Sequence, residues 1–141
     1  MAFANPAPEE ICRMLRGIHT IAVVGLSPNA ARPSFNVARA MQGYGFRIVP
    51  VRPKVLEVLG EQAYPDLESL PFKVDMVDVF RSAEHVPAIV ASCIALGIPR
   101  LWLQEGVIHE EAAQRAREAG ITVVMNRCMG RDYAQLCRQM P

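Results

Sequence analysis

Five short apolar runs recur along the chain, and each is followed by a stretch with turn signals or helical spacing. They lie at residues 20–26, 46–51, 74–80, 100–104 and 121–126. The first run, TIAVVGL, is β-branched and apolar without alternation, which is typical of a strand buried on both faces. Regular alternation of strands with helices requires right-handed crossovers and a sheet covered on both sides. We therefore predict an α/β, three-layer Rossmann-like domain with a five-stranded parallel sheet in the strand order 3-2-1-4-5.

Helical spacing and end signals predict the elements between these strands. An N-terminal helix is expected at residues 1–18 and a C-terminal helix at residues 130–141, with further helices starting at Pro33, Ser82 and His109. Between the second and third strands lies a long connection with one helical turn near residues 66–70. The length of 141 residues suits one domain. We therefore expect residues 1–141 to form a single domain.

The charge balance and the N-terminal segment exclude several classes of partner. Fifteen basic and fourteen acidic residues leave a net charge of +1, so no bulk field attracts nucleic acid. No apolar run reaches the length of a membrane span, and MAFANPAPEE has no signal-peptide pattern. We expect a cytoplasmic protein, monomeric or homodimeric, that binds neither nucleic acid nor membranes. The sequence does not indicate a protein partner.

Polar residues gather directly after the predicted strands, where ligands bind in such sheets. After the first strand, Gly25 allows close backbone approach, Arg32 adds charge, and a helix starting at Pro33 points N–H groups at an anion. These features indicate a pyrophosphate site. The G-x-G-x-x-G pattern of NAD sites is absent, and Arg52 and Lys54 follow the second strand instead of a carboxylate. A cationic tip favours a phosphorylated ribose, which both NADP and coenzyme A (CoA) carry.

The segments at these strand ends resemble those of the CoA-binding domain family. The segments are IAVVGLSPNAARPS, VRPKV, VDMVDVFRSAEHVP, LWLQEGV and VVMNRC, which together run over most of the chain. Members of this family are small stand-alone proteins similar to the N-terminal domain of the succinyl-CoA synthetase alpha subunit. The resemblance implies one CoA-binding Rossmann-like domain over residues 1–141, with no activity implied by the fold.

The resemblance also implies which positions bind CoA or an acyl-CoA, with Gly25 beside them. In order along the sequence they are Ser27, Arg32, Pro33 and Ser34 for the diphosphate, Pro53 and Lys54 for the phosphorylated ribose, Phe80, Arg81, Val86 and Ile89 for adenine, Gln104, Glu105 and Gly106 for pantetheine, and Asn126 and Cys128 near the thiol. The sequence departs from the family at two positions. Relatives commonly have asparagine in place of Arg52 and aspartate in place of Asn126.

Simpler structural roles are open for several of these residues. Phe80 could belong to the core, Arg81 could pair with Glu84, and Gln104 and Glu105 could cap the following helix. Arg52 could add a phosphate contact or lie on the surface.

The cysteines divide into two groups. Cys12, Cys93 and Cys137 lie in helical patterns and are expected as small buried hydrophobes. Cys128 follows Arg127 and precedes the last helix, and a cation with a helix N-terminus lowers a thiol pKa. Two hypotheses stay open for Cys128, a mixed disulfide with CoA and a packing thiol. No C-x-x-C pair or histidine at zinc-ligand spacing is present, so no metal site is expected.

No catalytic set can be assembled from the spacing of the three histidines, and no paired carboxylates stand out. The resembled synthetases use a phosphorylated histidine from a second domain, for which this chain has no room. We therefore expect a non-catalytic module that binds CoA or acyl-CoA and senses or delivers it. The alternatives are an NADP-binding redox enzyme or sensor, and a protein-interaction module whose nucleotide site has decayed.

Overall fold

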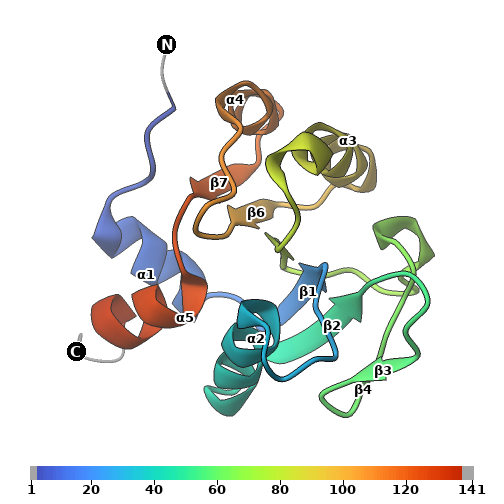
Figure 1. The fold of residues 1–141 in the computed structure, drawn as a ribbon. Coiled ribbons are helices and arrows are strands. Elements are labelled where there is room, and N and C mark those ends of the chain that lie inside the picture. Colours follow the sequence, from blue (N-terminus) through green and yellow to red (C-terminus); the bar gives the residue numbers. More distant parts are fainter. Residues whose placement is uncertain (1–2, 138–141) are drawn as a thin grey trace.

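The computed structural model describes residues 3–137 and contains the five predicted strands in one parallel sheet (Figure 1). The strands are β1 (Thr20–Val24), β2 (Arg47–Val51), β5 (Met76–Val79), β6 (Arg100–Leu103) and β7 (Thr122–Met125). In register, Ile21 of β1 stands beside Ile48 on one side and Met76 on the other. The α/β class, the Rossmann-like fold and the five-stranded parallel sheet are thus confirmed.

The predicted strand order is wrong. The sheet runs β2-β1-β5-β6-β7, so the third main strand pairs with the first and not with the second. After β2 the chain turns back along that strand, where the Tyr64 N–H donates to the Pro50 carbonyl and the Arg52 N–H to the Tyr64 carbonyl. This segment occupies the outer edge of β2. The next main strand, β5, pairs with the other edge of β1.

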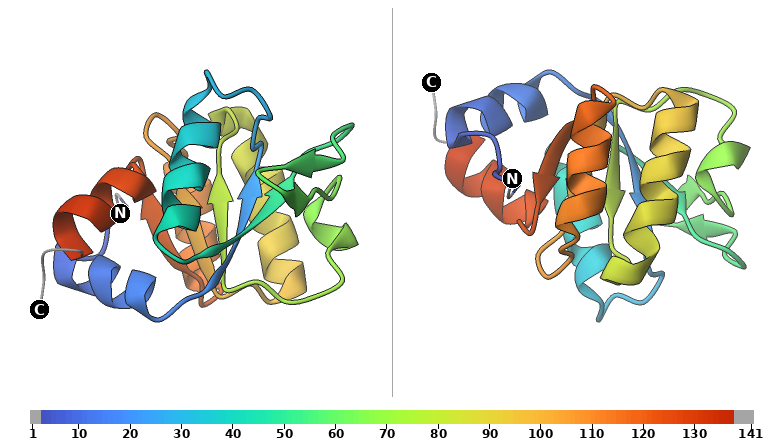
Figure 2. Two further views of the ribbon diagram at one scale, coloured as in Figure 1. Left: turned by 90° about the horizontal axis from the view of Figure 1, so that it is seen from below. Right: turned by 90° about the horizontal axis from the view of Figure 1, so that it is seen from above.

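Helices cover both faces of the sheet, which gives the three layers that were predicted (Figure 2). On one face lie α1 (Pro8–Arg16), α2 (Pro33–Gly43), α5 (Met129–Asp132) and the π-helical turn η3 (Tyr133–Cys137). On the other lie α3 (Val86–Leu96), preceded by the 3₁₀ turn η2 (Ala83–His85), and α4 (Glu110–Glu118). Each face has its own apolar core, with Trp102 fully buried on the first and Leu101 on the second.

The N-terminal helix is shorter than the predicted 1–18. It begins at Pro8, after Ala7 in an extended conformation, because the residue before a proline is disfavoured in helical geometry. Asn5 lies outside the helix and pairs with the backbone of Met125, donating at 2.9 Å and accepting at 2.7 Å. This contact covers the exposed edge of β7. Residues 1–2 lie outside the described part of the chain.

The C-terminal helix begins at Met129, one residue before the predicted 130, and is α-helical for one turn only. It continues as η3, whose Tyr133 ring lies 4.7 Å from the ring of Tyr44 and 5.4 Å from that of Phe46. The π-helical turn therefore keeps the terminal segment packed against the end of α2. The predicted residues 138–141 lie outside the described range.

The long connection between β2 and β5 contains more structure than was predicted. The expected helical turn is present as the 3₁₀ turn η1 (Leu67–Ser69). The Ser69 N–H donates a hydrogen bond to the Asp66 carboxylate at 2.8 Å. A small hairpin, β3 (Glu57–Val58) with β4 (Glu61–Gln62), was not predicted. Its turn residues Leu59 and Gly60 both have positive φ. The pair lacks the Asn-Gly signal by which such turns are usually found.

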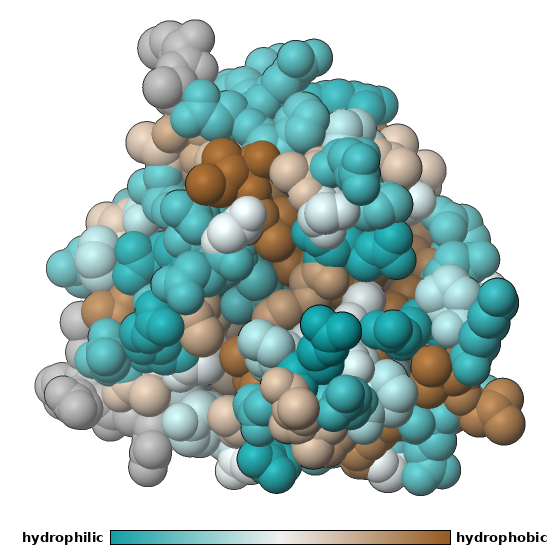
Figure 3. All heavy atoms as spheres, viewed as in Figure 1, coloured by the Kyte–Doolittle hydropathy of each residue, from teal (hydrophilic) through white to brown (hydrophobic). Residues whose placement is uncertain are grey.

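The outer surface has no broad apolar face in the view of Figure 3, where hydrophobic areas are small and separated by hydrophilic ones. Among the described residues, the exposed large hydrophobic ones are Leu56, Leu96 and Ile108, which belong to three different parts of the chain. Within residues 3–137, no helix is both long enough and apolar enough to cross a membrane.

Candidate functional site

The observed strand order sets the position of the candidate site. The chain leaves β1 toward β2 on one side, and β5 lies on the other side of β1. Connections that diverge in this way open a crevice beyond the carboxyl ends of the two strands, where ligands bind in doubly wound sheets. The loop after β1 and the loop after β5 therefore face each other across the candidate site.

A large cleft of about 1030 Å³ lies at this place. Its lining is Gly25, Ser27, Pro28, Asn29, Arg32, Pro33, Ser34, Val37, Arg52, Pro53, Phe80, Arg81, Gln104, Glu105, Gly106, Val107 and Cys128. The cleft thus brings together residues from the ends of β1, β2, β5 and β6 and from the start of α5. Most of the positions expected from the sequence are among them.

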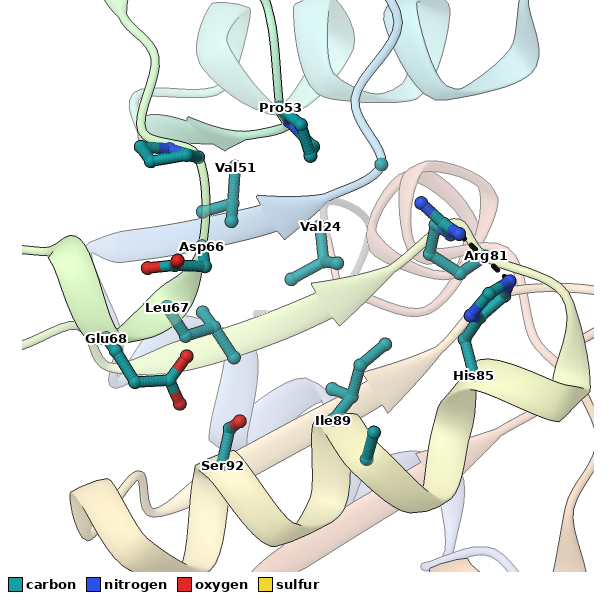
Figure 4. A pocket seen from close by; sticks show the side chains of 13 residues that line it. Val24, Val51, Pro53, Asp66, Leu67, Glu68, Arg81, His85, Ile89 and Ser92 are labelled. Carbon is teal, nitrogen blue, oxygen red and sulfur yellow. Dashed lines mark hydrogen bonds between the residues drawn. The ribbon is translucent and has the colours of Figure 1, made fainter.

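A small cavity of about 240 Å³ adjoins the large cleft and shares Gly25, Pro53 and Arg81 with it (Figure 4). Figure 4 shows Val24 and Ile89 pointing toward each other across this space. Asp66 and Glu68 of the η1 region lie at one end, and the Arg81–His85 pair lies at the other. The small cavity therefore has apolar walls and polar ends, which suits a flat heterocycle.

Gly25 is required by the close approach of the Phe80 backbone, which directly follows the neighbouring parallel strand β5. Its φ is +86°, and the carbonyl oxygen of Phe80 occupies the space that a β-carbon at Gly25 would need. The close approach expected at this glycine is therefore made by the chain itself, at the end of β5.

The loop from Ser27 to Ser34 is held by its own hydrogen bonds but leaves the start of α2 open. The Ser27 N–H donates to Ser34 Oγ at 3.0 Å, and the Asn29 N–H donates to Ser27 Oγ at 3.1 Å. Arg32 at the N-cap makes no side-chain cap. Among the described residues, the N–H groups of Ser34 and Phe35 have no hydrogen-bond acceptor. Free N–H groups at a helix start attract anions.

The large cleft carries a net positive charge. Its cations are Arg32, Arg52 and Arg81, and none of them has a carboxylate within salt-bridge distance in residues 3–137. Its one acid, Glu105, accepts from the Arg131 guanidinium at 2.8 Å, which holds the pKa of Glu105 below its usual value. The cleft is therefore electrostatically suited to a ligand with several negative charges.

One interpretation of the sequence paired Arg81 with Glu84, but the structure does not contain this pair. Arg81 Nη2 lies 2.9 Å from His85 Nε2. A guanidinium can only donate hydrogen bonds, so His85 Nε2 is the acceptor in this contact. The pair fixes Arg81 between the large cleft and the small cavity.

Three predicted residues line neither cavity: Lys54, Val86 and Asn126. Val86 is completely buried at the start of α3. Asn126 has a φ of +62°, and its side-chain oxygen accepts from the Gly106 N–H at 2.8 Å. An amide oxygen makes this bond as a carboxylate would, so asparagine retains the link between the two strand tips. Lys54 is exposed on the loop after β2.

Gln104 lies at the edge of the large cleft, but its polar atoms are used within the protein. Nε2 donates to Asp78 Oδ1 at 2.6 Å, and Oε1 accepts from the Met129 N–H at 3.4 Å. Glu105 pairs with Arg131, and His109 provides the N-cap of α4 by accepting from the Ala112 N–H. Neither Gln104 nor Glu105 therefore caps the following helix, contrary to one sequence interpretation.

Cys128 is half-buried and lines the large cleft as the N-cap of α5. The neighbouring Arg127 is not free to act on it, because its Nε and Nη2 donate to the Asp132 carboxylate at 2.5 and 3.0 Å. Cys12, Cys93 and Cys137 are buried free thiols, as predicted. Within residues 3–137, no group of three or more metal-ligating side chains gathers.

Several lining residues were missing from the set predicted by sequence. Val37 lies one helical turn after Ser34, so helical spacing alone could have indicated it. Arg52 was noted at a strand tip but was not included in the site. The acids Asp66 and Glu68 reach the small cavity only because the connection folds back along β2, and no local pattern indicates that path.

The fold and the site define a Rossmann-like α/β domain with a cationic cleft at its switch point. A family model for the CoA binding domain matches residues 19–134. The chain therefore belongs to the CoA binding domain family.

The chain is also similar to individual proteins. The chain is 39% identical over 125 residues to the uncharacterized protein YneT of Bacillus subtilis, covering 89% of this chain and 93% of that protein. It is 30% identical over 99 residues to the ADP-forming acetate–CoA ligase II of Archaeoglobus fulgidus, covering 69% of this chain and 15% of the ligase. A solved hypothetical protein from Pyrococcus horikoshii has a TM-score of 0.89 at 34% identity, covering 96% and 99% of the two chains.

Proposed function

We propose that this protein binds CoA or an acyl-CoA in the large cleft, as a non-catalytic module that senses CoA or delivers it. The observation that carries this proposal is the set of three arginines, Arg32, Arg52 and Arg81, that line one cleft without carboxylate partners in the described chain. These three cations match the three phosphoryl groups of CoA in number. Membership of the CoA binding domain family supports the same ligand.

The parts of the ligand have complementary surroundings. The diphosphate would lie at the open start of α2, beside Ser27, Arg32 and Ser34. Adenine would enter the small cavity between Val24 and Ile89, with Phe80 and Arg81 at its mouth. The pantetheine arm would follow residues 104–106 toward Cys128. A cleft of about 1030 Å³ is at the upper end of small-molecule sites, which suits a ligand of this length.

Isothermal titration calorimetry tests the proposal. Wild-type protein should release or absorb heat with CoA and acetyl-CoA, and Arg32→Gln should weaken CoA binding by roughly 10- to 100-fold through loss of one charge-assisted contact. Arg115→Gln removes the same charge from the outer surface of α4 and serves as a matched control. Absence of heat with wild type at millimolar CoA would refute the proposal.

NADP is the second candidate, because the cationic tip after β2 also suits a ribose 2′-phosphate. Fluorescence of NADPH on mixing with the protein distinguishes it from CoA. An interaction module with a decayed site is a third possibility, and measurable affinity for either nucleotide argues against it. A mass spectrum of ligand released from freshly purified protein identifies what the cleft holds in the cell.

A further inference from the structure

Two cationic residues follow β2, and their surroundings in the fold differ. Arg52 comes directly after the last residue of the strand, and its N–H donates to the Tyr64 carbonyl at 2.8 Å. Its backbone is therefore fixed by the hydrogen bonds at the sheet edge. Lys54 lies two residues further on, exposed, with a φ of +64°, and it lines neither cavity.

The side chain of Arg52 crosses from β2 to the end of β1. Its Nη1 lies 3.4 Å from the carbonyl oxygen of Gly25, and the residue lines the large cleft. Arg81 approaches the same glycine from β5, with its Cδ 3.1 Å from the position of a β-carbon there. The Arg52 and Arg81 side chains therefore approach Gly25 from two different strands, at the point where the large cleft meets the small cavity.

Most of the donor capacity of Arg52 is unused. A guanidinium has five N–H donors, and within residues 3–137 only Nη1 of Arg52 has a hydrogen-bond acceptor, at the long distance of 3.4 Å. The half-buried position of Arg52 and the contact of Nη1 with the Gly25 carbonyl limit the freedom of the side chain. A restrained guanidinium with free donors is suited to bidentate binding of a phosphoryl group, whereas a lysine acts as a point charge.

The end of the second strand is also where doubly wound domains meet the adenosine ribose, using a carboxylate for free hydroxyls and an arginine for a ribose phosphate. We infer that Arg52 is the specificity-determining residue of this cleft and selects ligands whose adenosine ribose carries a phosphoryl group. Lys54 contributes only a longer-range attraction. This inference rests on the proposed function and names the residue that carries its selectivity.

Titration of the full chain with CoA and with dephospho-CoA, which lacks only the ribose phosphoryl group, tests the inference. Arg52→Asn should weaken CoA binding by roughly 10- to 100-fold, as expected for a lost charge-assisted contact, and should change dephospho-CoA binding by less than about 3-fold. Arg52→Lys should lie between wild type and Arg52→Asn for CoA. Lys54→Ala should cost less than about 3-fold for either ligand, and Arg115→Asn should change neither affinity.

Each contrary outcome has a distinct meaning. Equal losses for both ligands in Arg52→Asn would mean that Arg52 binds the diphosphate, and the inference would be wrong. A loss specific to CoA in Lys54→Ala, without one in Arg52→Asn, would transfer the role to Lys54. Wild type that binds both ligands with equal affinity would overturn the inference but leave the proposed function intact. Wild type that binds neither would overturn both.

Discussion

Gln104 Nε2 donates a hydrogen bond to Asp78 Oδ1 at 2.6 Å, and both side chains are buried. Through its oxygen, Gln104 also accepts from the backbone N–H of Met129 at the start of α5. A polar connection thus runs from β5, through the tip of β6, to the segment that bears Cys128. Burial raises the pKa of Asp78 to about 7, although the Gln104 hydrogen bond opposes this shift.

Replacing Asp78 by Asn should change how stability depends on pH. Between about pH 4 and pH 7 the folded protein retains the Asp78 proton that the unfolded chain has lost, so the free energy of unfolding falls as pH rises. Asp78→Asn removes this fall, at up to about 1.4 kcal/mol per pH unit. Relative to wild type, the variant should therefore gain stability from pH 4.5 to pH 8 in urea denaturation. A difference that does not vary with pH would contradict this.

Asp75 directly precedes β5, and its pKa is shifted in the opposite direction to that of Asp78. Its carboxylate accepts from the N–H groups of Thr20 at 2.9 Å and His19 at 2.8 Å, which lowers its pKa. This stabilisation is present above the pKa of the unfolded chain and is lost as pH falls through the lowered folded value. Asp75→Asn should therefore destabilise the protein at neutral pH, and the difference should shrink on acidification to about pH 3.

Gly25→Ala should be much more costly than the same change at another glycine with positive φ. Alanine at Gly25 is strained at a φ of +86° and meets the Phe80 carbonyl, whereas Gly120 has a φ of +93° with open space around it. We expect Gly120→Ala to lose about 1 kcal/mol and Gly25→Ala about 2–4 kcal/mol in urea denaturation. Similar losses at the two positions would show that the Phe80 contact adds nothing.

The two ion pairs near α5 should contribute unequally to stability. Arg127→Gln leaves the Asp132 carboxylate, whose side chain is 6% exposed, without its cation, and should cost about 1–3 kcal/mol. Arg131→Gln removes the solvent-exposed pair with Glu105 and should cost less than about 1 kcal/mol. Equilibrium unfolding compares the two variants directly. A larger loss for Arg131→Gln would contradict the burial argument.

Alkylation should distinguish Cys128 from the other three thiols. Cys128 is half-buried in the large cleft, whereas Cys12, Cys93 and Cys137 are at most 2% exposed. Burial also raises the pKa of the Cys93 and Cys137 thiols to about 12. Brief iodoacetamide treatment of the native protein should therefore modify Cys128 alone, and modification should slow when CoA is present.

Mass spectrometry of wild type and Cys128→Ser checks this order of reactivity. Modification of Cys93 as fast as Cys128 would contradict it. The same spectra, taken on protein purified without reductant, distinguish a mixed disulfide with CoA from a packing thiol. A CoA-sized adduct in wild type that Cys128→Ser lacks supports the disulfide, and its absence from both samples excludes it.

Elements with strong local patterns were predicted well. The strands at 20–26 and 74–80 were found because buried parallel strands are apolar throughout, and the turn near residues 66–70 was found because Asp66 is a good N-cap. The hairpin at 57–62 was missed because each strand has only two residues. The role of Gln104 was also missed, because its partner Asp78 lies 26 residues away and on another strand.

The sequence by itself determined how many main strands this protein has, which segments they use and which polar residues follow them. These properties depend on backbone preferences and burial patterns within about ten residues. Only the tertiary structure decided the strand order, because that order depends on pairing between strand edges that lie far apart in the sequence. The segment around Tyr64 bonds to the outer edge of β2 at its end, and β5 pairs with the other side of β1. That pairing places Arg81 beside Gly25, where Arg52 also lies, and so forms the cationic cleft.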